Sequence, residues 1–431
     1  MSLATNAPLH EIFAQHPHWQ QVQTVVRALS AKGFTAYLAG GAVRDALLGE
    51  PVHDFDIVTS ALPEDLEEII KRATGKHALD IGKQFGIMMI PVGDGRERIE
   101  MATFRSDGAY VDGRHPQSVT FASAEEDAKR RDFTVNALFY DFQKDRVIDF
   151  VQGLKDLKGG IIRAVGEPRR RFQEDKLRLL RAVRFSAQLG FQIEPETYRA
   201  IQALADELRV VSRERITAEL VRLSQARNVA SGFAALIDTG LFRVIFEPLK
   251  FIEVEQYRNR FLRALARLSG IGSLELILSL MFIVEIEAAK SHGRIAQVTD
   301  KVLQSFSLSR ASYHYIHFLV NGAKSLREDP EAALMCLDTE EGPLLSELGF
   351  SLESIGLLPH HRVGQILERY LKLAGNLGRL PAPFVNGNDL KDLGVAAGPK
   401  IGEILAVLYK KQLRGEIVDR GEALQMARQI L

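Results

Sequence analysis

The chain has 431 residues, of which 46% are hydrophobic and 26% are charged, so it can bury more than one core and is expected to form about two to four domains. Its 55 lysines and arginines balance its 55 aspartates and glutamates, so net charge gives no reason to expect a polyanionic partner, and only a local basic patch could bind one. The single cysteine, Cys336, excludes an internal disulfide and a zinc site built from several cysteines, and it favours a reducing compartment, the cytoplasm.

The first 150 residues are predicted to mix helices and strands. Apolar residues at helical spacing are followed by a short strand that ends at a glycine pair, and a proline followed by acidic residues begins a further helix. The expected elements in chain order are a helix over 10–31, a strand over 34–40, a helix over 42–48, a strand over 53–59, a helix over 63–73, and strands over 85–92 and 98–105.

The next segments are less regular. Residues 105–122 are polar and contain glycines without a sustained period, which predicts a mobile loop, and residues 146–166 are expected to form a strand, a turn and a strand. From Pro168 onward, helical spacing dominates. The longest apolar stretch, 276–284, is too short for a membrane helix, which needs roughly 18 apolar residues, so we expect a buried helix there and no membrane association.

The predicted fold is therefore of the α+β class, with a mixed-sheet head followed by all-helical domains. Glycines and prolines over 380–402 mark a boundary before a final helix over 399–414. The predicted domains are a head over 1–150, a helical neck over 151–230, a helical body over 231–378 and a helical tail over 379–431.

Two aspartates, Asp54 and Asp56, lie one residue apart in the strand predicted over 53–59. Because strand side chains alternate between faces, both carboxylates are expected on one face, with Phe55 and Ile57 on the other. Such a pair can share hard cations, and nucleotidyl transfer uses Mg²⁺ to neutralise charge on the phosphates. The pair therefore indicates a magnesium site, although an isolated aspartate pair is more often a solvated strand end.

The preceding glycines strengthen this interpretation. Gly40 and Gly41 leave backbone amides free to approach phosphate oxygens, and the helix after them would add its positive N-terminal end. Arg44 and Asp45 on that helix are open to two interpretations: they pair with each other or cap the helix, or they contact a phosphate. Glu100, on a neighbouring predicted strand, is either a third catalytic carboxylate or an ordinary exposed acid.

Three stretches together resemble the bacterial (class II) tRNA nucleotidyltransferases, the family of CCA-adding enzymes and bacterial poly(A) polymerases within the DNA polymerase beta superfamily. They are GGAVRDALLGEPVHDFDIVT at 40–59, RRDFTVNALFYD at 130–141 and RFQEDKLRLLRAVRFSAQLGF at 171–191. The resemblance is strong over about residues 34–225. It implies a nucleotidyltransferase head followed by helical neck, body and tail domains, and Mg²⁺-dependent addition of the terminal CCA of tRNA from CTP and ATP without a template.

Several positions match the motifs of the family residue by residue. By this resemblance Asp54 and Asp56 are the metal ligands, and the turn at the phosphates consists of Gly40, Gly41 and Arg44. The residues that would hold the ribose and triphosphate of the nucleotide are Arg131, Asp132 and Asn136. This placement is chemically sensible, because an aspartate can accept a hydrogen bond from the ribose 2′-hydroxyl and an arginine can fork onto phosphate oxygens.

The third stretch bears on the choice of base. Glu174, Asp175 and Arg178 are expected to be neighbours on one predicted helix. Cytosine and adenine present an amine donor beside a ring-nitrogen acceptor, whereas uracil and guanine present a carbonyl beside an N–H, so a fixed aspartate and arginine could reject the second pattern by roughly 10⁴-fold. The resemblance assigns base reading to Asp175 and Arg178, with Glu174 orienting the arginine and Arg181 also at the nucleotide. The alternative is an ordinary surface network of ion pairs.

The predicted loop over 105–122 carries Arg105 and Asp107, and in the family a loop at this place is thought to move the base-reading residues. Its full length disfavours an enzyme that adds only the two cytidines. Residues 168–184 hold seven basic and two acidic residues, a local cationic surface suited to tRNA phosphates. The candidates for tRNA contact are Arg169, Arg170, Arg171, Arg184, Arg213 and Arg215.

Three alternatives to full CCA addition remain: addition of the last adenosine alone, poly(A) addition, and RNA binding by an inactive protein. The sequence EDK at 174–176, where poly(A) polymerases usually have EDP, and the lack of a long basic tail favour the tRNA enzyme. Intact Asp54 and Asp56 disfavour an inactive protein. The middle region has no neighbouring His-Asp pair, which a phosphohydrolase domain would require, so no phosphatase activity is expected. The sequence leaves open the oligomeric state and the tRNA contacts of the tail.

Overall fold

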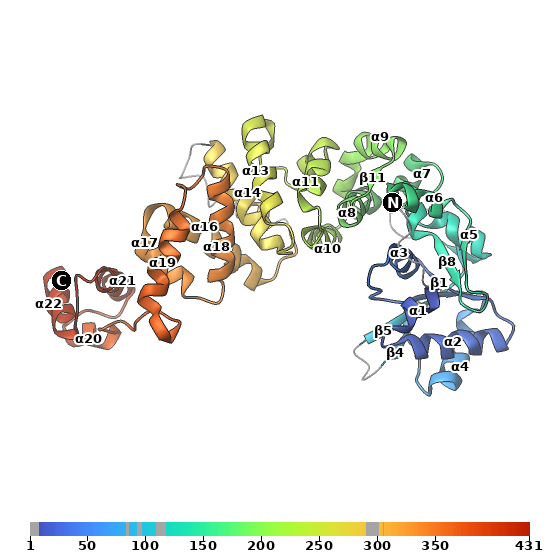
Figure 1. Ribbon diagram of the computed structural model, residues 1–431, viewed down its shortest axis with the longest axis horizontal. Coiled ribbons are helices and arrows are strands. Elements are labelled where there is room, and N and C mark those ends of the chain that lie inside the picture. The colour runs from blue at the N-terminus through green and yellow to red at the C-terminus, as the bar shows by residue number, and fades with distance from the viewer. Residues whose placement is uncertain (1–7, 83–85, 93–96, 109–117, 290–300, 305) are drawn as a thin grey trace. The chain divides into compact units, whose positions relative to one another are not determined.

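A computed structural model of the protein, shown in Figure 1, describes residues 8–82, 86–92, 97–108, 118–289, 301–304 and 306–431. Packing divides the chain into two compact units, Met1–Glu247 and Pro248–Leu431. The first unit contains the sheets, and the described residues of the second unit form only helices and their connections, which confirms the α+β class. The finer division into four domains stays a prediction. In the described part of the chain, no helix is long and apolar enough to cross a membrane.

A seven-stranded mixed sheet forms the centre of the first unit. Its strands stand in the order β3-β4-β5-β2-β1-β8-β9, with β2 parallel to β5 and the other neighbours antiparallel. The bounds are β1 Ala36–Ala39, β2 Asp56–Thr59, β3 Leu79–Gly82, β4 Ile87–Val92, β5 Glu97–Thr103, β8 Leu138–Asp141 and β9 Arg146–Asp149. The strands expected between residues 34 and 105 are therefore present, but the one predicted over 53–59 begins only at Asp56.

Helices near the N-terminus cover one face of this sheet. The helix expected over 10–31 is interrupted and forms α1 (Leu9–Ala14) and α2 (Trp19–Ala31). On α1 the ring of Phe13 lies 5.9 Å from that of Phe55 and 5.1 Å from that of Tyr140. Because Phe55 and Ile57 are both buried, alternation along the strand turns Asp56 toward the opposite face.

Two further helices follow the predicted pattern. Helix α3 is Gly41–Leu48 and helix α4 is Pro63–Thr74. Pro63 occupies the first turn of α4 with two acidic residues, where a missing N–H is tolerated and negative charge is favoured, and the helix ends at Gly75 with φ 69°.

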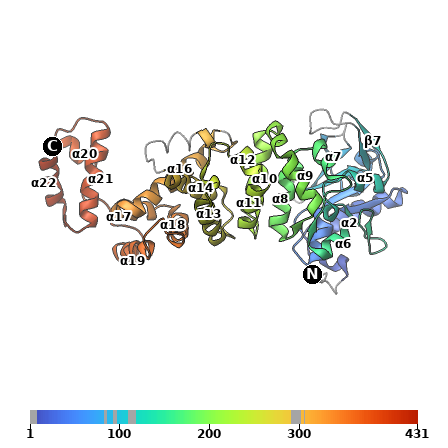
Figure 2. The ribbon, with the colours of Figure 1, turned by 90° about the horizontal axis from the view of Figure 1, so that it is seen from above.

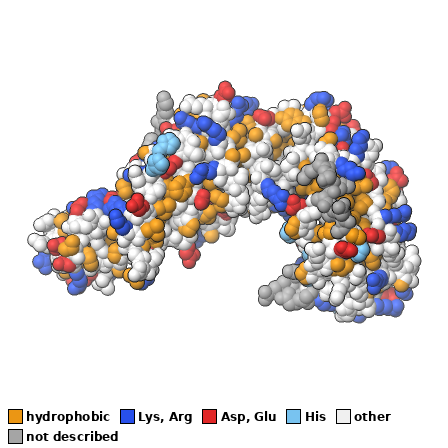
Figure 3. Space-filling model, in the orientation of Figure 1, with side chains coloured by type: hydrophobic (Ala, Val, Ile, Leu, Met, Phe, Trp, Pro, Cys, Tyr) orange, Lys and Arg blue, Asp and Glu red, His pale blue; other side chains and the backbone are white. Residues whose placement is uncertain are grey.

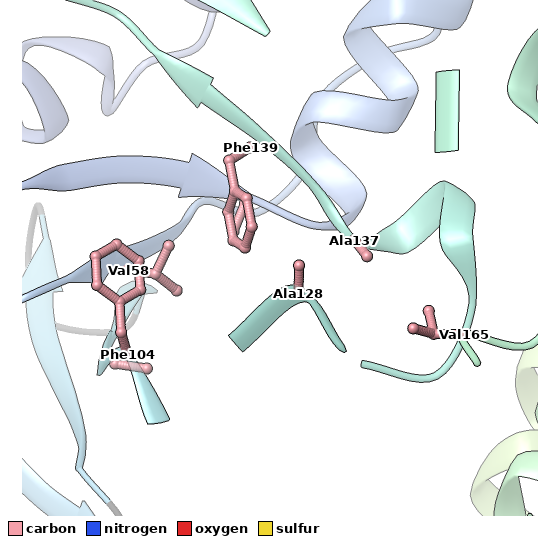
Figure 4. Packing of buried hydrophobic residues seen from close by; sticks show 8 residues of the cluster. Val58, Phe104, Ala128, Ala137, Phe139 and Val165 are labelled. Atoms are coloured by element: carbon pink, nitrogen blue, oxygen red, sulfur yellow. The ribbon is translucent and has the colours of Figure 1, made fainter. Parts of the chain in front are cut away.

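A hydrophobic cluster, part of which Figure 4 shows as sticks, packs on the face of the sheet that carries Asp56. Ala128 in this cluster comes from α5 (Ala124–Arg130), whose N-terminus is fixed by a capping box between Ser123 and Glu126. This packing brings the C-terminal end of α5, with its arginines, to the same side of the sheet as Asp56. The labelled members of the cluster are Val58, Phe104, Ala128, Ala137, Phe139 and Val165.

The loop predicted over 105–122 is only partly a loop. Its two ends form an antiparallel ribbon of β6 (Arg105–Asp107) and β7 (Val119–Phe121), with Arg105 opposite Phe121. Residues 109–117, where the centre of the predicted loop falls, lie outside the described residues. Pairing between residues twelve to sixteen positions apart explains the difference, because neither strand has an apolar period of its own.

The turn expected within 146–166 is a helix, α6 (Gly153–Gly159). The Asp149 carboxylate accepts hydrogen bonds from the amides of Gly153 at 2.9 Å and Leu154 at 3.0 Å and so satisfies the first turn. Gly153 permits close packing, since a β-carbon there would lie 2.2 Å from the carbonyl oxygen of Thr134. Gly153 is therefore required by a tertiary contact.

Helices complete the first unit. Helices α8, α10 and α11 pack against one another, as Figures 1 and 2 both show. The bounds are α7 Pro168–Glu174, α8 Leu177–Leu189, α9 Pro195–Leu204, α10 Arg213–Ser224, α11 Val229–Asp238 and α12 Leu241–Ile245.

The second unit contains the buried helix that the apolar stretch 276–284 predicted, now α14. The helix expected over 399–414 is α21, but it is not the last one, because α22 follows it. The helix bounds are α13 Glu255–Arg267, α14 Leu274–Ala289, α16 Arg310–Glu328, α17 Pro330–Leu337, α18 Gly342–Ser354, α19 Arg362–Ala374, α20 Gly387–Asp392, α21 Pro399–Leu413 and α22 Arg420–Ile430.

Candidate functional site

A cavity of about 450 Å³ lies in the first unit, lined by residues of the sheet, of α3, of α8 and of α10. Of the predicted catalytic, nucleotide-binding and loop residues, Asp54, Glu174 and Asp107 do not line it. Those that do are Gly40, Gly41, Arg44, Asp56, Glu100, Arg105, Arg131, Asp132, Asn136, Asp175, Arg178 and Arg181.

The glycine turn allows charged groups to approach closely. Gly40 adopts φ 72° and ψ −130°, a conformation that favours glycine, and its N–H donates to the carbonyl of Leu138 at 3.1 Å. A β-carbon at Gly40 would lie 3.3 Å from Arg131 Nη1 and 3.5 Å from Asp56 Oδ2. The turn therefore brings backbone, guanidinium and carboxylate together because this position has no side chain.

Two acids stand side by side at the cavity. Asp56 of β2 is opposite Glu100 of the parallel strand β5. Burial raises the pKa of Asp56 to about 6; the negative charges of Glu100 and Asp54 add to the rise, and Arg131 opposes it. Asp54 itself precedes the strand and is exposed. The expected pair of aspartates on one strand is thus only partly present, because the acid beside Asp56 within the sheet is Glu100.

The donor set can be tested for a divalent ion. Among the described residues, no three His, Cys, Asp or Glu side chains are grouped so that they could hold a metal ion by themselves. Magnesium, however, is commonly held by one or two carboxylates together with substrate phosphates and waters. Burial and the neighbouring Glu100 raise the pKa of Asp56, so a nearby cation would stabilise its ionised form. Asp56 and Glu100 therefore fit an ion that is held by these carboxylates and by a phosphate together.

We expect Asp56→Asn to stabilise the metal-free protein at alkaline pH. The raised pKa means that the native state binds this proton more tightly than the unfolded chain does, so the stability contributed by the carboxyl falls as pH rises from about 4 through about 6. A neutral amide removes a cost of about 1–3 kcal/mol. Thermal melts in EDTA should show a higher Tm for the variant at pH 8 and little difference at pH 4. An equal difference at both pH values would contradict this assignment of the pKa.

Arg44 forms the ion pair that the sequence left open. Its Nε donates to Asp45 Oδ1 at 2.8 Å and its Nη2 to Asp45 Oδ2 at 3.0 Å. Its Nη1 also donates to the side-chain oxygen of Asn136, and its guanidinium lies 5.3 Å from the ring centre of Phe185. Arg44 is buried and lines the cavity, so its geometry allows the mutual pair and a ligand contact together. The phosphate contact stays a prediction.

Asn136 accepts from Arg44 at its side-chain oxygen and donates to Asp132 from its side-chain nitrogen, and both oxygens of Asp132 accept hydrogen bonds. Its Oδ2 accepts from Arg181 Nε at 2.9 Å, and its Oδ1 accepts from the amide of Phe133 at 2.8 Å and from Asn136 Nδ2 at 3.2 Å. Burial alone would raise the pKa of Asp132, but the charge and hydrogen bonds of Arg181 and the charge of Arg178 hold it well below its ordinary value. Asp132 is therefore an ionised acceptor.

The helix predicted to carry Glu174, Asp175 and Arg178 is broken. Glu174 ends α7, Asp175 is extended with φ −142° and ψ 107°, and α8 begins at Leu177. The Asp175 side chain accepts a hydrogen bond from the amide of Leu177 at 3.1 Å, a local bond that competes with helix continuation. The expected ion pair between Glu174 and Arg178 nevertheless forms across the break at 3.0 Å.

Arg178 is held in place by main-chain groups as well. Its Nη1 donates to the carbonyl of Arg171 and its Nη2 to the carbonyl of Arg130, both at 3.2 Å. It is therefore a fixed donor at the cavity, as base reading requires. Whether it reads a base stays a prediction.

The predicted loop residues lie on β6, close to α5. Arg105 Nε is 3.2 Å from Asp107 Oδ1, and Asp107 Oδ2 is 3.9 Å from Arg130 Nη1. Arg105 reaches the cavity, whereas Asp107 does not. The ribbon is thus connected to the end of α5 by the ion pair between Asp107 and Arg130.

Figure 3 shows basic and acidic side chains interspersed over the visible face. The cationic stretch 168–184 is only partly available to a polyanion. Arg169 and Arg170 on α7 are exposed. Arg171 instead donates to the carbonyls of Lys129, Arg130 and Val165, so it fastens α7 to the head. A tRNA contact by Arg171 does not fit this geometry.

The three other candidates for tRNA contact are also engaged. Arg184 is buried, with its Nε 2.6 Å from Glu219 Oε2, an arrangement that disfavours the predicted contact with tRNA. Arg213 donates to the carbonyl of Ile245 at 3.4 Å. Arg215 lines the cavity and pairs with Asp175, and its predicted contact with tRNA stays a prediction. Ion pairs between distant helices, which no local pattern reveals, account for these differences.

Arg184→Ala is expected to lower the free energy of unfolding by about 3 kcal/mol, because it leaves the buried carboxylate of Glu219 without its closest cation. Burial already lowers the pKa of Arg184 to about 10 in spite of that carboxylate. Urea denaturation of Arg184→Ala and of the exposed Arg169→Ala provides the comparison. A stable Arg184→Ala protein with weakened tRNA binding would restore the original prediction.

Sequence reasoning missed Phe185 as part of the site. Its ring lies 5.2 Å from the guanidinium of Arg181 and 3.7 Å from that of Arg184, in addition to its contact with Arg44. The spacing of Arg181 and Phe185, four residues apart on one helix, could have indicated the first contact. The contact with Arg44 depends on the tertiary fold.

Known proteins match most of the chain. The Poly A polymerase head domain family matches residues 36–163, and a family described as Probable RNA and SrmB- binding site of polymerase A matches residues 190–252. The CCA-adding enzyme of Ligilactobacillus salivarius is 34% identical over 413 residues, which cover 93% of each chain. That of Enterococcus faecalis is 42% identical over 252 residues, 55% of this chain and 60% of that one.

A solved structure agrees with these sequence matches. The Bacillus stearothermophilus CCA-adding enzyme in complex with CTP is 30% identical, with a TM-score of 0.70 over 96% of this chain and 98% of that chain. These likenesses confirm the family that the three sequence stretches predicted. The chain therefore belongs to the class II family of CCA-adding enzymes and poly(A) polymerases, and it is a CCA tRNA nucleotidyltransferase.

Proposed function

We propose that this protein builds the complete 3′-terminal CCA of tRNA from CTP and ATP without a nucleic-acid template. The observation that carries the proposal is a single cavity with Asp56 and Glu100 on the sheet side and Asp175 and Arg178 on the helix side. Its volume of about 450 Å³ lies within the range of small-molecule sites. One nucleotide could thus present its phosphates to the first pair and its base to the second.

The phosphate end is assigned to the glycine turn and its neighbours. The amide of Gly41, at the start of α3, would face phosphate oxygens, with Arg44 and Arg131 supplying positive charge. The N–H of Gly40 already donates to Leu138, so Gly40 would contribute by its lack of a side chain. Asp132 would accept from the ribose 2′-hydroxyl. Its oxygens accept four hydrogen bonds, two of them from Arg181, and a carboxylate has about four acceptor positions, so the hydroxyl would replace one of the Arg181 bonds or share an oxygen with it.

Nucleotidyltransferases of this family use divalent metal ions, and we propose Mg²⁺ for this one. Asp54 and Asp56 would hold it, with Glu100 as a further acid. When bound, the ion neutralises negative charge on the phosphates during transfer. The raised pKa of Asp56 supports this assignment, because an adjacent cation favours the ionised form that the site otherwise disfavours.

The base end is assigned to Asp175 and Arg178, with Glu174 orienting the arginine. An acceptor beside a donor matches the amine and ring nitrogen shared by cytosine and adenine. Arg178 donates three hydrogen bonds that fix its direction, which is what discrimination by hydrogen bonding requires. The exposed Arg169 and Arg170 are proposed to contact tRNA phosphates, and the tail, residues 379–431, to contact the tRNA as well.

The proposed function is tested with three tRNA substrates, which end before the CCA, after the first C, and after CC. Each is incubated with magnesium and CTP, ATP or both, and the products are resolved to single nucleotides. We expect two cytidines and one adenosine on the first substrate and a stop at that length. A cytoplasmic location, which the single cysteine favours, goes with this substrate.

The other outcomes identify the alternatives. Extension only of the substrate that ends in CC would assign an A-adding enzyme, and long adenosine ladders would assign a poly(A) polymerase. A gel shift without extension would assign an RNA-binding protein.

A further inference from the structure

Arg215 reaches the cavity from α10, forty residues beyond the acid it binds. Its Nη2 donates to Asp175 Oδ2 at 2.7 Å, and both residues line the cavity. The two side chains are only 22% and 17% exposed. A hydrogen bond between two ionised groups that are largely shielded from water is stronger and more directional than a surface ion pair.

Asp175 needs such support because no helix fixes it. The residue is extended between α7 and α8, and its own segment supplies one restraint, the hydrogen bond from the amide of Leu177 to Oδ1 at 3.1 Å. Arg215 supplies the second restraint, at the other oxygen. Together the two bonds fix the rotation of the carboxylate about its last torsion, which is otherwise soft.

The carboxylate held in this way can still accept from a ligand. Its two oxygens offer about four acceptor positions, of which the Leu177 amide and Arg215 take two. The remaining positions have a direction that the two bonds determine.

We propose that Arg215 is a positioning residue for Asp175 and thereby determines which nucleotides the enzyme accepts. The proposal rests on the base-reading role given to Asp175 above. A fixed acceptor favours the amine of cytosine or adenine and opposes the carbonyl of uracil, whereas a carboxylate free to rotate could turn away from that carbonyl and reduce the penalty.

The same helix supports the ribose side of the cavity. Glu219, one turn after Arg215, lies 3.5 Å from Arg181 Nη1, and Arg181 binds Asp132. Helix α10 therefore connects to both acids that the nucleotide would meet, to Asp175 through Arg215 and to Asp132 through Glu219 and Arg181.

The test measures kcat and KM for CTP and for UTP on tRNA that ends before the CCA, in the wild type and in Arg215→Gln and Arg215→Lys. Arg209→Gln is the matched control, because Arg209 is an exposed arginine of the same unit with loose ion pairs at 3.7 and 3.5 Å. We expect the CTP-to-UTP ratio of kcat/KM to fall by about 10–100-fold in Arg215→Gln. The fall should be smaller but at least severalfold in Arg215→Lys, with the KM for tRNA unchanged.

Other results would overturn the proposal. If a folded Arg215→Gln protein keeps the wild-type CTP-to-UTP ratio of kcat/KM, whatever its absolute rate, Arg215 has only a structural role. If that ratio is unchanged and the KM for tRNA is raised, Arg215 contacts tRNA instead. If Arg215→Gln fails to fold by circular dichroism, a wild-type ratio in Arg215→Lys overturns the proposal. If the wild type extends no tRNA, the proposed function fails, and equilibrium binding of CTP against UTP to wild type and variant decides the inference separately.

Discussion

Asp56→Asn is expected to lower the rate of nucleotide addition by at least about a thousandfold. The carboxylate stands between the glycine turn and Glu100, where the phosphates and a divalent ion are proposed to meet. An amide keeps the size of the side chain but removes its negative charge, and loss of one group that stabilises transition-state charge typically costs a factor of about 10²–10³, more where a metal ligand is lost. Single-turnover addition of CMP to tRNA that ends before the CCA measures the effect.

The matched control for this substitution is Asp65→Asn, an exposed aspartate in the first turn of α4, which should retain nearly full activity. Binding of tRNA by Asp56→Asn should equal that of the wild type, which separates chemistry from substrate affinity. A variant that keeps more than about a tenth of the wild-type rate would remove Asp56 from the proposed metal site.

The other two acids are distinguished by the same assay. Asp54→Asn is expected to lose activity on a similar scale if Asp54 is a ligand, although the side chain is exposed and does not line the cavity. Glu100→Gln tests the third acid, which lies opposite Asp56 in the sheet. Retained activity in Asp54→Asn together with loss in Glu100→Gln would move the proposed ligand pair from 54 and 56 to 56 and 100.

The two predictions for Asp56→Asn are connected by one physical cause. The site holds a carboxylate whose pKa is raised to about 6, so at the pH of the reaction it is ionised at a cost to folding. The same uncompensated charge is what favours a divalent ion. The substitution should therefore raise stability and abolish activity together, a result that a carboxylate with a merely structural role would not give.

Local sequence patterns predicted the parts of the site that local structure determines. Alternation along a strand turned Asp56 away from the buried Phe55, and the glycine pair placed a turn before α3. Both features depend on neighbours within a few residues. In the structure twelve of the predicted residues, which come from distant segments, line one cavity, and all of them except Glu100 were also indicated by the family resemblance.

The structure differs from the prediction where a residue depends on partners that are distant in the sequence. The ion pairs of Asp175 and Arg184 are made with Arg215 and Glu219, two residues of α10 that are distant in the sequence. A run of basic residues looks like a surface for a polyanion until the carboxylates that neutralise it are placed in space. Residues 168–184 contain too few acids to reveal those partners, because the acids and carbonyls involved lie elsewhere in the chain.

Gly40→Ala is expected to reduce activity by about a hundredfold and to destabilise the first unit. At φ 72° and ψ −130° an alanine is strained by about 1–3 kcal/mol, and its β-carbon would press on Arg131 Nη1 at 3.3 Å while touching Asp56 Oδ2 at 3.5 Å. Relief of either contact moves a group that the phosphates are proposed to meet, and a displacement of about 1 Å at such a place can cost about 10²-fold in rate.

Gly41→Ala is the matched comparison, because the two glycines are adjacent and differ in their geometry. Gly41 is the first residue of α3 and has no positive φ, and a β-carbon there would make only an ordinary contact, 3.6 Å from Arg44 Nη2. Its melting temperature should therefore stay near that of the wild type, and its loss of activity should be much smaller than that of Gly40→Ala. Equal losses in the two variants would show that the turn acts through flexibility shared by both glycines, since the close approach of Arg131 and Asp56 exists only at Gly40.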